Sequence, residues 1–318
     1  MTHTFPSGPA SAPMTVSFRS RELRCDATFY RSEAAEPAPC IVMAHGFGGV
    51  RSAVLPEIAT AFAATGFQVF LFDYRYWGTS GGQPRGLVDL NAQRADYRAA
   101  IAHVRTLTCV DPTRVVAWGT SLSAGHVLEV AADDADLAAA VITNPYTDGR
   151  AAATIVLRTA GRRTACALLL RGIIDRIRRA LGASPLRVDL VGEPGSRALI
   201  TAAGAASSYR VVVPPDDHGR SPAVPARIVL DLPRDRPVTR AGSVRCPILV
   251  CVCDRDRIAP RGAAQAVARR APLGHLQSYP VDHFGLFHEP WRSRVVRDQT
   301  DFLWNVLDPP RRTLGGPR

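Results

Sequence analysis

Short apolar runs alternate along the chain with stretches in which apolar residues recur every three or four positions. The runs predict buried strands, and the spaced positions predict amphipathic helices. Strands are expected at residues 14–20, 22–31, 39–44, 67–72, 111–120, 137–143, 246–253 and 276–279. Helices are expected at residues 53–65, 88–107, 121–132, 262–271 and 291–307. This alternation implies an α/β fold with a mainly parallel central sheet flanked by helices.

Residues 150–245 interrupt the alternation, and 96 residues are too many for a plain connection. Helices are expected at 151–160 and 164–181. The second helix gathers Ala165, Leu168, Leu169, Ile173, Ile174 and Ile177 broadly together, opposite Arg171, Arg176, Arg178 and Arg179. We interpret the segment as a helical lid over the carboxyl ends of the strands, where such sheets carry their catalytic groups. An ordinary helical decoration is the alternative.

The predicted organisation is a core formed by residues 14–149 and 246–307, with a lid, or cap, insertion at 150–245. Residues 1–13 are expected to be a flexible leader. They lack the basic start and the apolar stretch of a signal peptide. Residues 308–318, rich in Pro, Gly and Arg, are expected to be a disordered tail. No apolar run reaches the length of a membrane span.

The apolar run that ends at Trp118 leads into Gly119-Thr120-Ser121-Leu122-Ser123, and a helix-compatible run follows. This is the sequence form of a nucleophile elbow, in which a sharp strand-to-helix turn exposes a serine oxygen above a sheet. Small neighbours are needed because strand and helix backbones pass closely there. Ser123 replaces the last glycine of G-x-S-x-G and is expected to pack on the helix. A buried structural serine at position 121 is the alternative.

Composition narrows the possible chemistry. The 318 residues contain no lysine, so all 39 basic residues are arginine, which excludes a lysine Schiff base and a P-loop lysine. The net charge is +11, and residues 150–245 hold 17 arginines against seven acidic residues. Tyr209 is the only aromatic residue in that segment, which argues against nucleic-acid binding by base stacking.

Seven scattered cysteines, several of them in apolar runs, indicate reduced thiols and a cytoplasmic protein. Cys251 and Cys253 are expected to pack in the core, because a lone Cys-x-Cys is weak evidence for zinc. We expect no metal, since no His, Asp or Glu cluster has ligand spacing. We expect no cofactor, since the glycines at 78–82 do not form a nucleotide-binding motif.

Taken together, the strand before His45-Gly46-Phe47-Gly48-Gly49, the loop from Asp73 to Gly82, the elbow, a late carboxylate and a late histidine resemble the α/β-hydrolase superfamily of serine hydrolases. The resemblance covers about residues 15–307. The run G-T-S-x-S-x-G-H-V is similar to bacterial hydrolases and to the fungal polyketide transferase and thiohydrolase subgroup. Such families order their catalytic groups as serine, acid and histidine.

That order implies a catalytic triad of Ser121, Asp256 and His283. A serine hydroxyl needs a neighbouring imidazole to take its proton. Of eight histidines, only His283 is late, preceded by a strand and followed by a loop. His45, His126 and His288 are expected to be structural, packed and surface residues, respectively.

The acid orients the imidazole and stabilises its cationic form. The resembling families carry this carboxylate four residues before a proline, here Pro260, which points to Asp256. Asp254 and Asp148 remain alternatives. The oxyanion hole needs two backbone N–H groups. Leu122, after the nucleophile, supplies one, and the resemblance places the other at Phe47.

The leading hypothesis is a serine hydrolase that cleaves a small-molecule carboxylic ester or thioester through an acyl-enzyme. The second is an acyltransferase or cyclase that acts on a polyketide-like chain, with an acidic acyl-carrier protein docked on the arginine-rich lid. The third is a non-catalytic binding module with the hydrolase fold. Specificity lies in the lid, so the substrate is left open.

Overall fold

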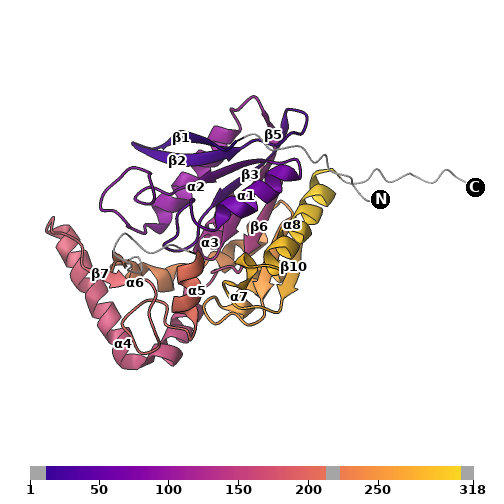
Figure 1. The fold of residues 1–318 in the computed structure, drawn as a ribbon. Coiled ribbons are helices and arrows are strands. Elements are labelled where there is room, and N and C mark those ends of the chain that lie inside the picture. The colour runs from indigo at the N-terminus through magenta and orange to yellow at the C-terminus, as the bar shows by residue number, and fades with distance from the viewer. Residues whose placement is uncertain (1–11, 213–222, 309–318) are drawn as a thin grey trace, which may run out of the picture.

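The computed structural model describes residues 12–212 and 223–308. Its centre is an eight-stranded sheet of order β1-β2-β4-β3-β5-β6-β9-β10, parallel from β4 to β10 with an antiparallel pair at one edge (Figure 1). The strands are β1 (Met14–Ser20), β2 (Leu23–Tyr30), β3 (Ala38–Ala44), β4 (Gln68–Phe72), β5 (Val110–Thr120), β6 (Ala139–Thr143), β9 (Ile248–Cys253) and β10 (Gly274–Tyr279). Short strands β7 (Arg187–Asp189) and β8 (Ala223–Pro225) pair separately.

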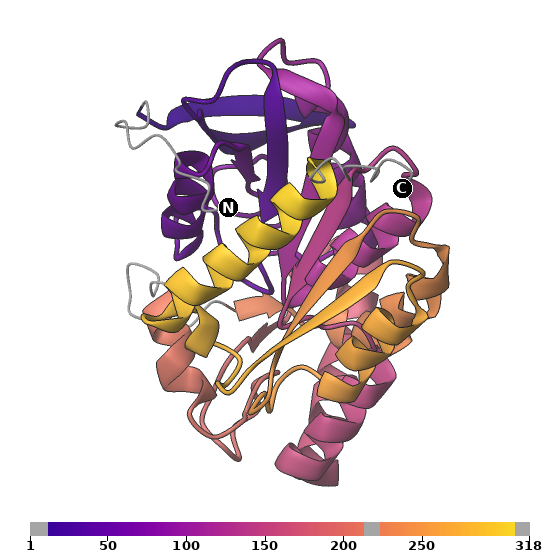
Figure 2. The ribbon, with the colours of Figure 1, turned by 90° about the vertical axis from the view of Figure 1, so that its right-hand side faces the viewer.

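Two groups of helices cover the sheet. One face packs against α2 (Leu90–Val104), α3 (Leu122–Asp133) and α7 (Arg261–Arg270). The other packs against α1 (Leu55–Ala64) and α8 (Trp291–Leu307), and α8 crosses in front of the strands in Figure 2. All seven residues of β3 are buried, as expected for a strand covered on both faces. The predicted α/β class is confirmed.

The predicted strands and helices of this core are all present, with ends shifted by a few residues. The largest shift is in the helix expected at 88–107, which spans Leu90–Val104, whereas the strand expected to open at Asp111-Pro112 begins at Val110. Asp89 sets the start of α2, because its side chain accepts a hydrogen bond from the N–H of Ala92. The expectations for residues 1–11 and 309–318 lie outside the described residues.

Between β6 and β9 lie α4 (Gly149–Ala180), α5 (Ala205–Val212), α6 (Ile228–Asp231) and the 3₁₀ turns η1 (Leu232–Arg234) and η2 (Pro237–Ser243). A further 3₁₀ turn, η3 (Gly285–Phe287), precedes α8. The two helices expected at 151–160 and 164–181 meet in α4 at Gly161, whose backbone is non-helical at φ +80° and ψ 164°. No helix in residues 12–212 and 223–308 is long and apolar enough to cross a membrane.

A polar contact fixes the rotation of α4. The Asp175 carboxylate is fully buried and accepts from the Arg227 guanidinium at 2.6 Å, from the Arg227 backbone N–H and from the Leu186 N–H. Of the six apolar residues that the sequence places together on this helix, only Leu168 is buried. The helix therefore packs inward through Leu168, Gly172 and Asp175 and leaves most of its aliphatic side chains outside.

The Asp175→Ala variant tests this anchor. It leaves the Arg227 guanidinium buried without its carboxylate, which costs about 3 kcal/mol of unfolding free energy. The matched control is Asp231→Ala, which breaks the exposed Arg176–Asp231 pair and costs less than about 1 kcal/mol. Urea unfolding followed by circular dichroism measures both, and equal losses would contradict the assignment.

Candidate active site

Ser121 occupies the turn between β5 and α3 with φ +54° and ψ −119°, a conformation that side chains other than glycine rarely adopt. Two backbone hydrogen bonds hold it there. The Ser121 N–H donates to the carbonyl of Thr143 at 3.0 Å, and the Tyr146 N–H donates to the Ser121 carbonyl at 3.0 Å. The turn has the backbone that the elbow motif predicts.

The neighbours of Ser121 show why the turn requires small residues. A Cβ on Gly119 would lie 2.6 Å from the Ser123 carbonyl oxygen, so strand and helix pass too closely there for any side chain. Ser123 itself is buried, and its Oγ lies 2.8 Å from the Tyr74 hydroxyl. Its placement agrees with the packing role expected from the sequence.

His283 and Asp256 complete a chain of hydrogen bonds with Ser121. The His283 Nε2 lies 3.1 Å from Ser121 Oγ, and its Nδ1 lies 2.7 Å from Asp256 Oδ2. The other oxygen of Asp256 accepts from the N–H groups of Ile258 and Ala259 at 2.7 and 2.9 Å. With Nδ1 protonated and bonded to the carboxylate, Nε2 is free to accept the serine proton.

Asn144 is a residue of this site that the sequence reasoning missed. It has a positive φ of 40°, and its Nδ2 donates to the His283 carbonyl at 2.7 Å. Its Oδ1 accepts from the Thr120 hydroxyl at 2.6 Å. Asn144 thus ties the loop that carries the histidine to the strand end that carries the serine. The available signal was its position directly after a buried strand.

The other candidate acids lie elsewhere. Asp148 caps the start of α4 by accepting from the N–H groups of Arg150 and Ala151, and it pairs with Arg236 at 2.8 Å. Asp254 is exposed and lies 3.5 Å from the Arg261 guanidinium. Of the three carboxylates considered, only Asp256 contacts His283.

Two further histidines are buried, and burial lowers the pKa of each. Removal from water lowers the pKa of His126, whose Nε2 lies 2.9 Å from Gln93 Oε1, well below its usual value. Burial also lowers the pKa of His45, against the opposing effect of Asp73. His288, expected at the surface, is half-buried. None of the three contacts Ser121 through a described hydrogen bond.

The loop after β3 brings Phe47 to the serine. Phe47 and Ser121 line the same two cavities. Leu122 is the first residue of α3, so its N–H has no partner inside the helix. The Phe47 N–H donates to no backbone carbonyl in the described part of the chain. No described backbone hydrogen bond therefore occupies either of the two N–H groups expected to form an oxyanion hole.

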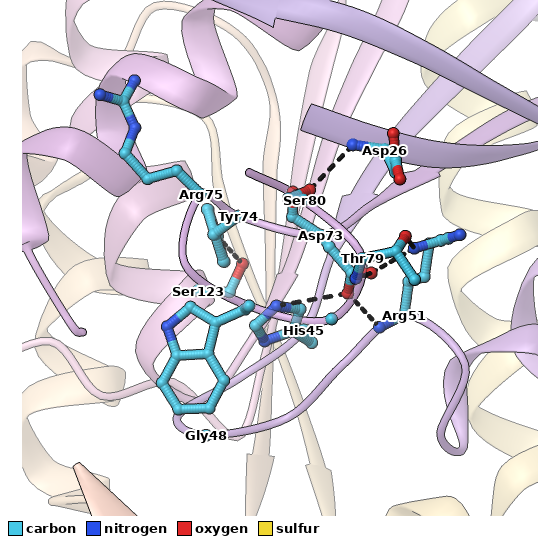
Figure 3. A network of polar contacts seen from close by, with 12 residues as sticks. Asp26, His45, Gly48, Arg51, Asp73, Tyr74, Arg75, Thr79, Ser80 and Ser123 are labelled. Atoms are coloured by element: carbon cyan, nitrogen blue, oxygen red, sulfur yellow. Dashed lines mark hydrogen bonds and ion pairs between the residues drawn. The ribbon is translucent and has the colours of Figure 1, made fainter. Parts of the chain in front are cut away.

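A network of hydrogen bonds and ion pairs connects the loop after β3, which carries Phe47, to the loop after β4 (Figure 3). The buried Asp73 carboxylate accepts from the Arg51 N–H at 2.7 Å, pairs with the Arg51 guanidinium, and lies 3.8 Å from His45 Nε2. The Ser80 hydroxyl donates to the Asp73 carbonyl and accepts from the Asp26 N–H, both at 2.8 Å. The glycine-rich loop after β4 therefore anchors the Phe47 loop, a role that sequence reasoning did not assign.

A cavity of about 390 Å³ opens beside Ser121. Its walls are almost wholly apolar, and α4 supplies many of them, including Ala153, Val156, Leu157 and Leu168. Among the described residues, no charged side chain lines it. Such a space accommodates a hydrocarbon chain attached to a carbonyl held at the serine.

In the described residues, no group of three or more His, Cys, Asp or Glu side chains is arranged to hold a metal ion. All seven cysteines are free thiols.

The sheet order, the strained serine turn and the hydrogen-bonded histidine and aspartate at the strand ends define an α/β hydrolase. Comparison with known proteins agrees. Residues 35–292 match the family model described as Serine aminopeptidase, S33, and the chain belongs to this family of α/β hydrolases.

Relatives extend the match over most of the chain. The quorum-quenching protein AidA of Acinetobacter baumannii is 40% identical over 93% of this chain and 96% of its own. Polyketide transferase ATR5 of Stachybotrys chlorohalonatus is 34% identical over 49% of this chain and 50% of its own. The crystal structure of the α/β hydrolase GrgF from Penicillium sp. superposes with a TM-score of 0.78 at 20% identity, covering 93% of this chain and 99% of GrgF. The predicted resemblance to bacterial hydrolases and the fungal subgroup is confirmed.

The buried histidines predict a pH dependence of stability. A histidine whose folded pKa lies below the unfolded value near 6.5 binds its proton more readily in the unfolded chain, so stability falls as the pH drops below about 6.5. His126 contributes about 1.4 kcal/mol per pH unit to this slope. Urea unfolding between pH 5 and 7 will show a shallower slope in His126→Gln, whereas His275→Gln, at an exposed position, will keep it.

Proposed function

We propose that the protein is a serine hydrolase that cleaves carboxylic esters or thioesters of apolar acyl groups through an acyl-enzyme. The observation that carries the proposal is the continuous hydrogen-bond chain from Asp256 through His283 to Ser121, beside a cavity with apolar walls. Both features are needed, because the hydrogen-bond chain without a cavity would indicate no substrate, and a cavity without a nucleophile would indicate no reaction.

In the proposed mechanism, Ser121 Oγ attacks the substrate carbonyl while His283 Nε2 accepts its proton. Asp256 keeps the imidazole oriented and stabilises its cationic form. The N–H groups of Phe47 and Leu122 bind the negative charge that develops on the carbonyl oxygen. The tetrahedral intermediate then expels the alcohol or thiol, which takes the proton from His283. Water, activated by the same histidine, hydrolyses the acyl-enzyme and restores Ser121.

The substrate class follows from the cavity. Its apolar walls favour an aliphatic or polyketide-like acyl group, and the lack of a charged side chain among its described lining residues disfavours a charged one. We propose that residues 150–245 act as the lid of this cavity, since α4 supplies several of its walls. The name of the bacterial relative, a quorum-quenching protein, and the names of fungal relatives, thiohydrolases, are compatible with small acyl substrates.

Acyl transfer is the second candidate, favoured by relatives named polyketide transferases that match about half of the chain. The same acyl-enzyme serves, and an alcohol or amine takes the place of water. Product analysis with each acceptor present distinguishes the two. The third hypothesis, a non-catalytic binding module, gives no reason for an intact hydrogen-bonded serine, histidine and aspartate. The acyl-carrier partner and the cytoplasmic location stay predictions.

Ser121→Ala tests the nucleophile, with Ser123→Ala as a matched control two residues along the chain. Loss of the hydroxyl at 121 lowers hydrolysis of p-nitrophenyl esters at least ~1000-fold and abolishes labelling by a fluorophosphonate probe. The Ser123 hydroxyl contacts only Tyr74 in the described hydrogen bonds, so its removal leaves labelling intact. Undiminished labelling of Ser121→Ala would refute the assignment.

Ala153→Phe tests the cavity as the acyl site. Ala153 lines the cavity, so a phenyl ring there occupies space that a long chain needs. We expect KM for decanoyl esters to rise roughly tenfold while KM for acetyl esters changes little. Thr154→Phe is the control, because Thr154 is the exposed neighbour and does not line the cavity. Equal effects on short and long esters would place the acyl chain elsewhere.

A further inference from the structure

The outer side of α4 is unusually apolar. Of the ten large apolar side chains that are exposed in the described residues, six lie between 169 and 181, at or just beyond the end of this helix: Leu169 at 43%, Leu170 at 57%, Ile173 at 48%, Ile174 at 40%, Ile177 at 55% and Leu181 at 77%. We call these six residues the outer apolar face. The helix lies at the edge of the molecule, away from the central sheet (Figure 1).

This face points away from the part of the helix that is packed. At 100° per residue, it is centred on the side opposite Leu168, Gly172 and Asp175, the three residues buried in this half of α4. The buried Asp175–Arg227 ion pair holds that orientation. The helix cannot rotate to bury its aliphatic side chains without disturbing the pair, so they stay available to another surface.

The spacing fits another helix. Leu170, Ile173, Ile177 and Leu181 recur at intervals of three and four residues, which is the pattern of a seam between two packed helices. Six aliphatic side chains at about half exposure leave roughly 600 Å² of apolar surface per copy, close to the ~800 Å² per partner that a stable interface buries.

The charges near the face allow self-association. Arg176 is paired with Asp231, and Arg171 donates to the carbonyl of Arg187. The only acidic residue of α4, Asp175, is buried. Arginines at the border of an apolar interface keep their charged ends in water, and a symmetric partner then contributes aliphatic groups at the centre.

The face is continuous with the substrate cavity. Leu169 belongs to both, and Leu157, which is 47% exposed, also lines the cavity. We propose that a second copy of the chain packs against the outer apolar face and that this pairing closes the open side of the cavity. The pairing stands on exposure and spacing alone, whereas its effect on catalysis rests on the proposed function.

Sedimentation equilibrium of the full chain tests the pairing. Wild type will be a dimer at micromolar concentration, and Ile173→Gln/Ile177→Gln will raise the dissociation constant at least ~100-fold. Neither substituted residue lines the cavity. Leu273→Gln/Leu276→Gln is the matched control, because these side chains are 48% and 46% exposed but lie near and on β10. The control will remain a dimer.

Three outcomes would overturn the pairing: a monomeric wild type at 100 µM, a dimer that survives the α4 substitutions, or a dimer that the control also dissociates. Raising salt from 0.05 to 0.5 M separates the proposal from its competitors. Apolar pairing will not weaken, whereas binding of α4 to vesicles with 30% phosphatidylglycerol or to an acidic carrier protein falls steeply. A monomer that binds such vesicles contradicts the proposal.

Kinetics test the effect on the cavity separately. The monomeric double variant will show about a tenfold higher KM for decanoyl esters and an unchanged kcat/KM for acetyl esters. Unchanged decanoyl kinetics in a proven monomer would refute the closure. A wild type that dimerises yet hydrolyses no ester would refute the proposed function while leaving the pairing intact.

Discussion

The turn at Ser121 is the constraint on which the rest of the site depends. Its positive φ costs on the order of 1–3 kcal/mol, and it persists because the surrounding structure over-determines it. Two hydrogen bonds tie it to the end of β6 and the residues beyond, and the absence of a side chain at Gly119 lets α3 leave at a sharp angle.

Parallel register brings the remaining groups to that turn. Thr120 pairs with Thr143, Thr143 with Cys251, and Cys253 with Tyr279, so four strands end at one edge of the sheet. Each strand is followed within a few residues by a side chain of the site: Ser121, Asn144, Asp256 and His283. Residues up to 162 positions apart therefore meet without any long-range signal in the sequence. The sequence signals only the buried strands, and the shared edge where these strands end brings the four side chains together.

This arrangement explains which parts of the fold and of the site could be predicted from the sequence. The strands, the elbow and the late histidine follow local rules of periodicity and turn chemistry, so they were predictable one at a time. The choice of Asp256 required the family resemblance, because Asp254 follows the same strand and differs from Asp256 only in where its side chain points. Asn144 and Asp73 were missed because their partners, His283 and Arg51, are defined only after folding. Local patterns do not encode such contacts.

The orientation of α4 shows the same limit and gives it a physical reason. Helical periodicity groups Leu169, Ile173, Ile174 and Ile177 correctly, but it wrongly adds Leu168, which is buried on the opposite side, and it cannot tell which side faces the protein. Here one buried carboxylate decides, because turning the helix would break the Asp175–Arg227 pair and leave the buried Arg227 guanidinium without its carboxylate. The half of α4 that this pair anchors also supplies Leu168 and Leu169 to the walls of the cavity beside Ser121.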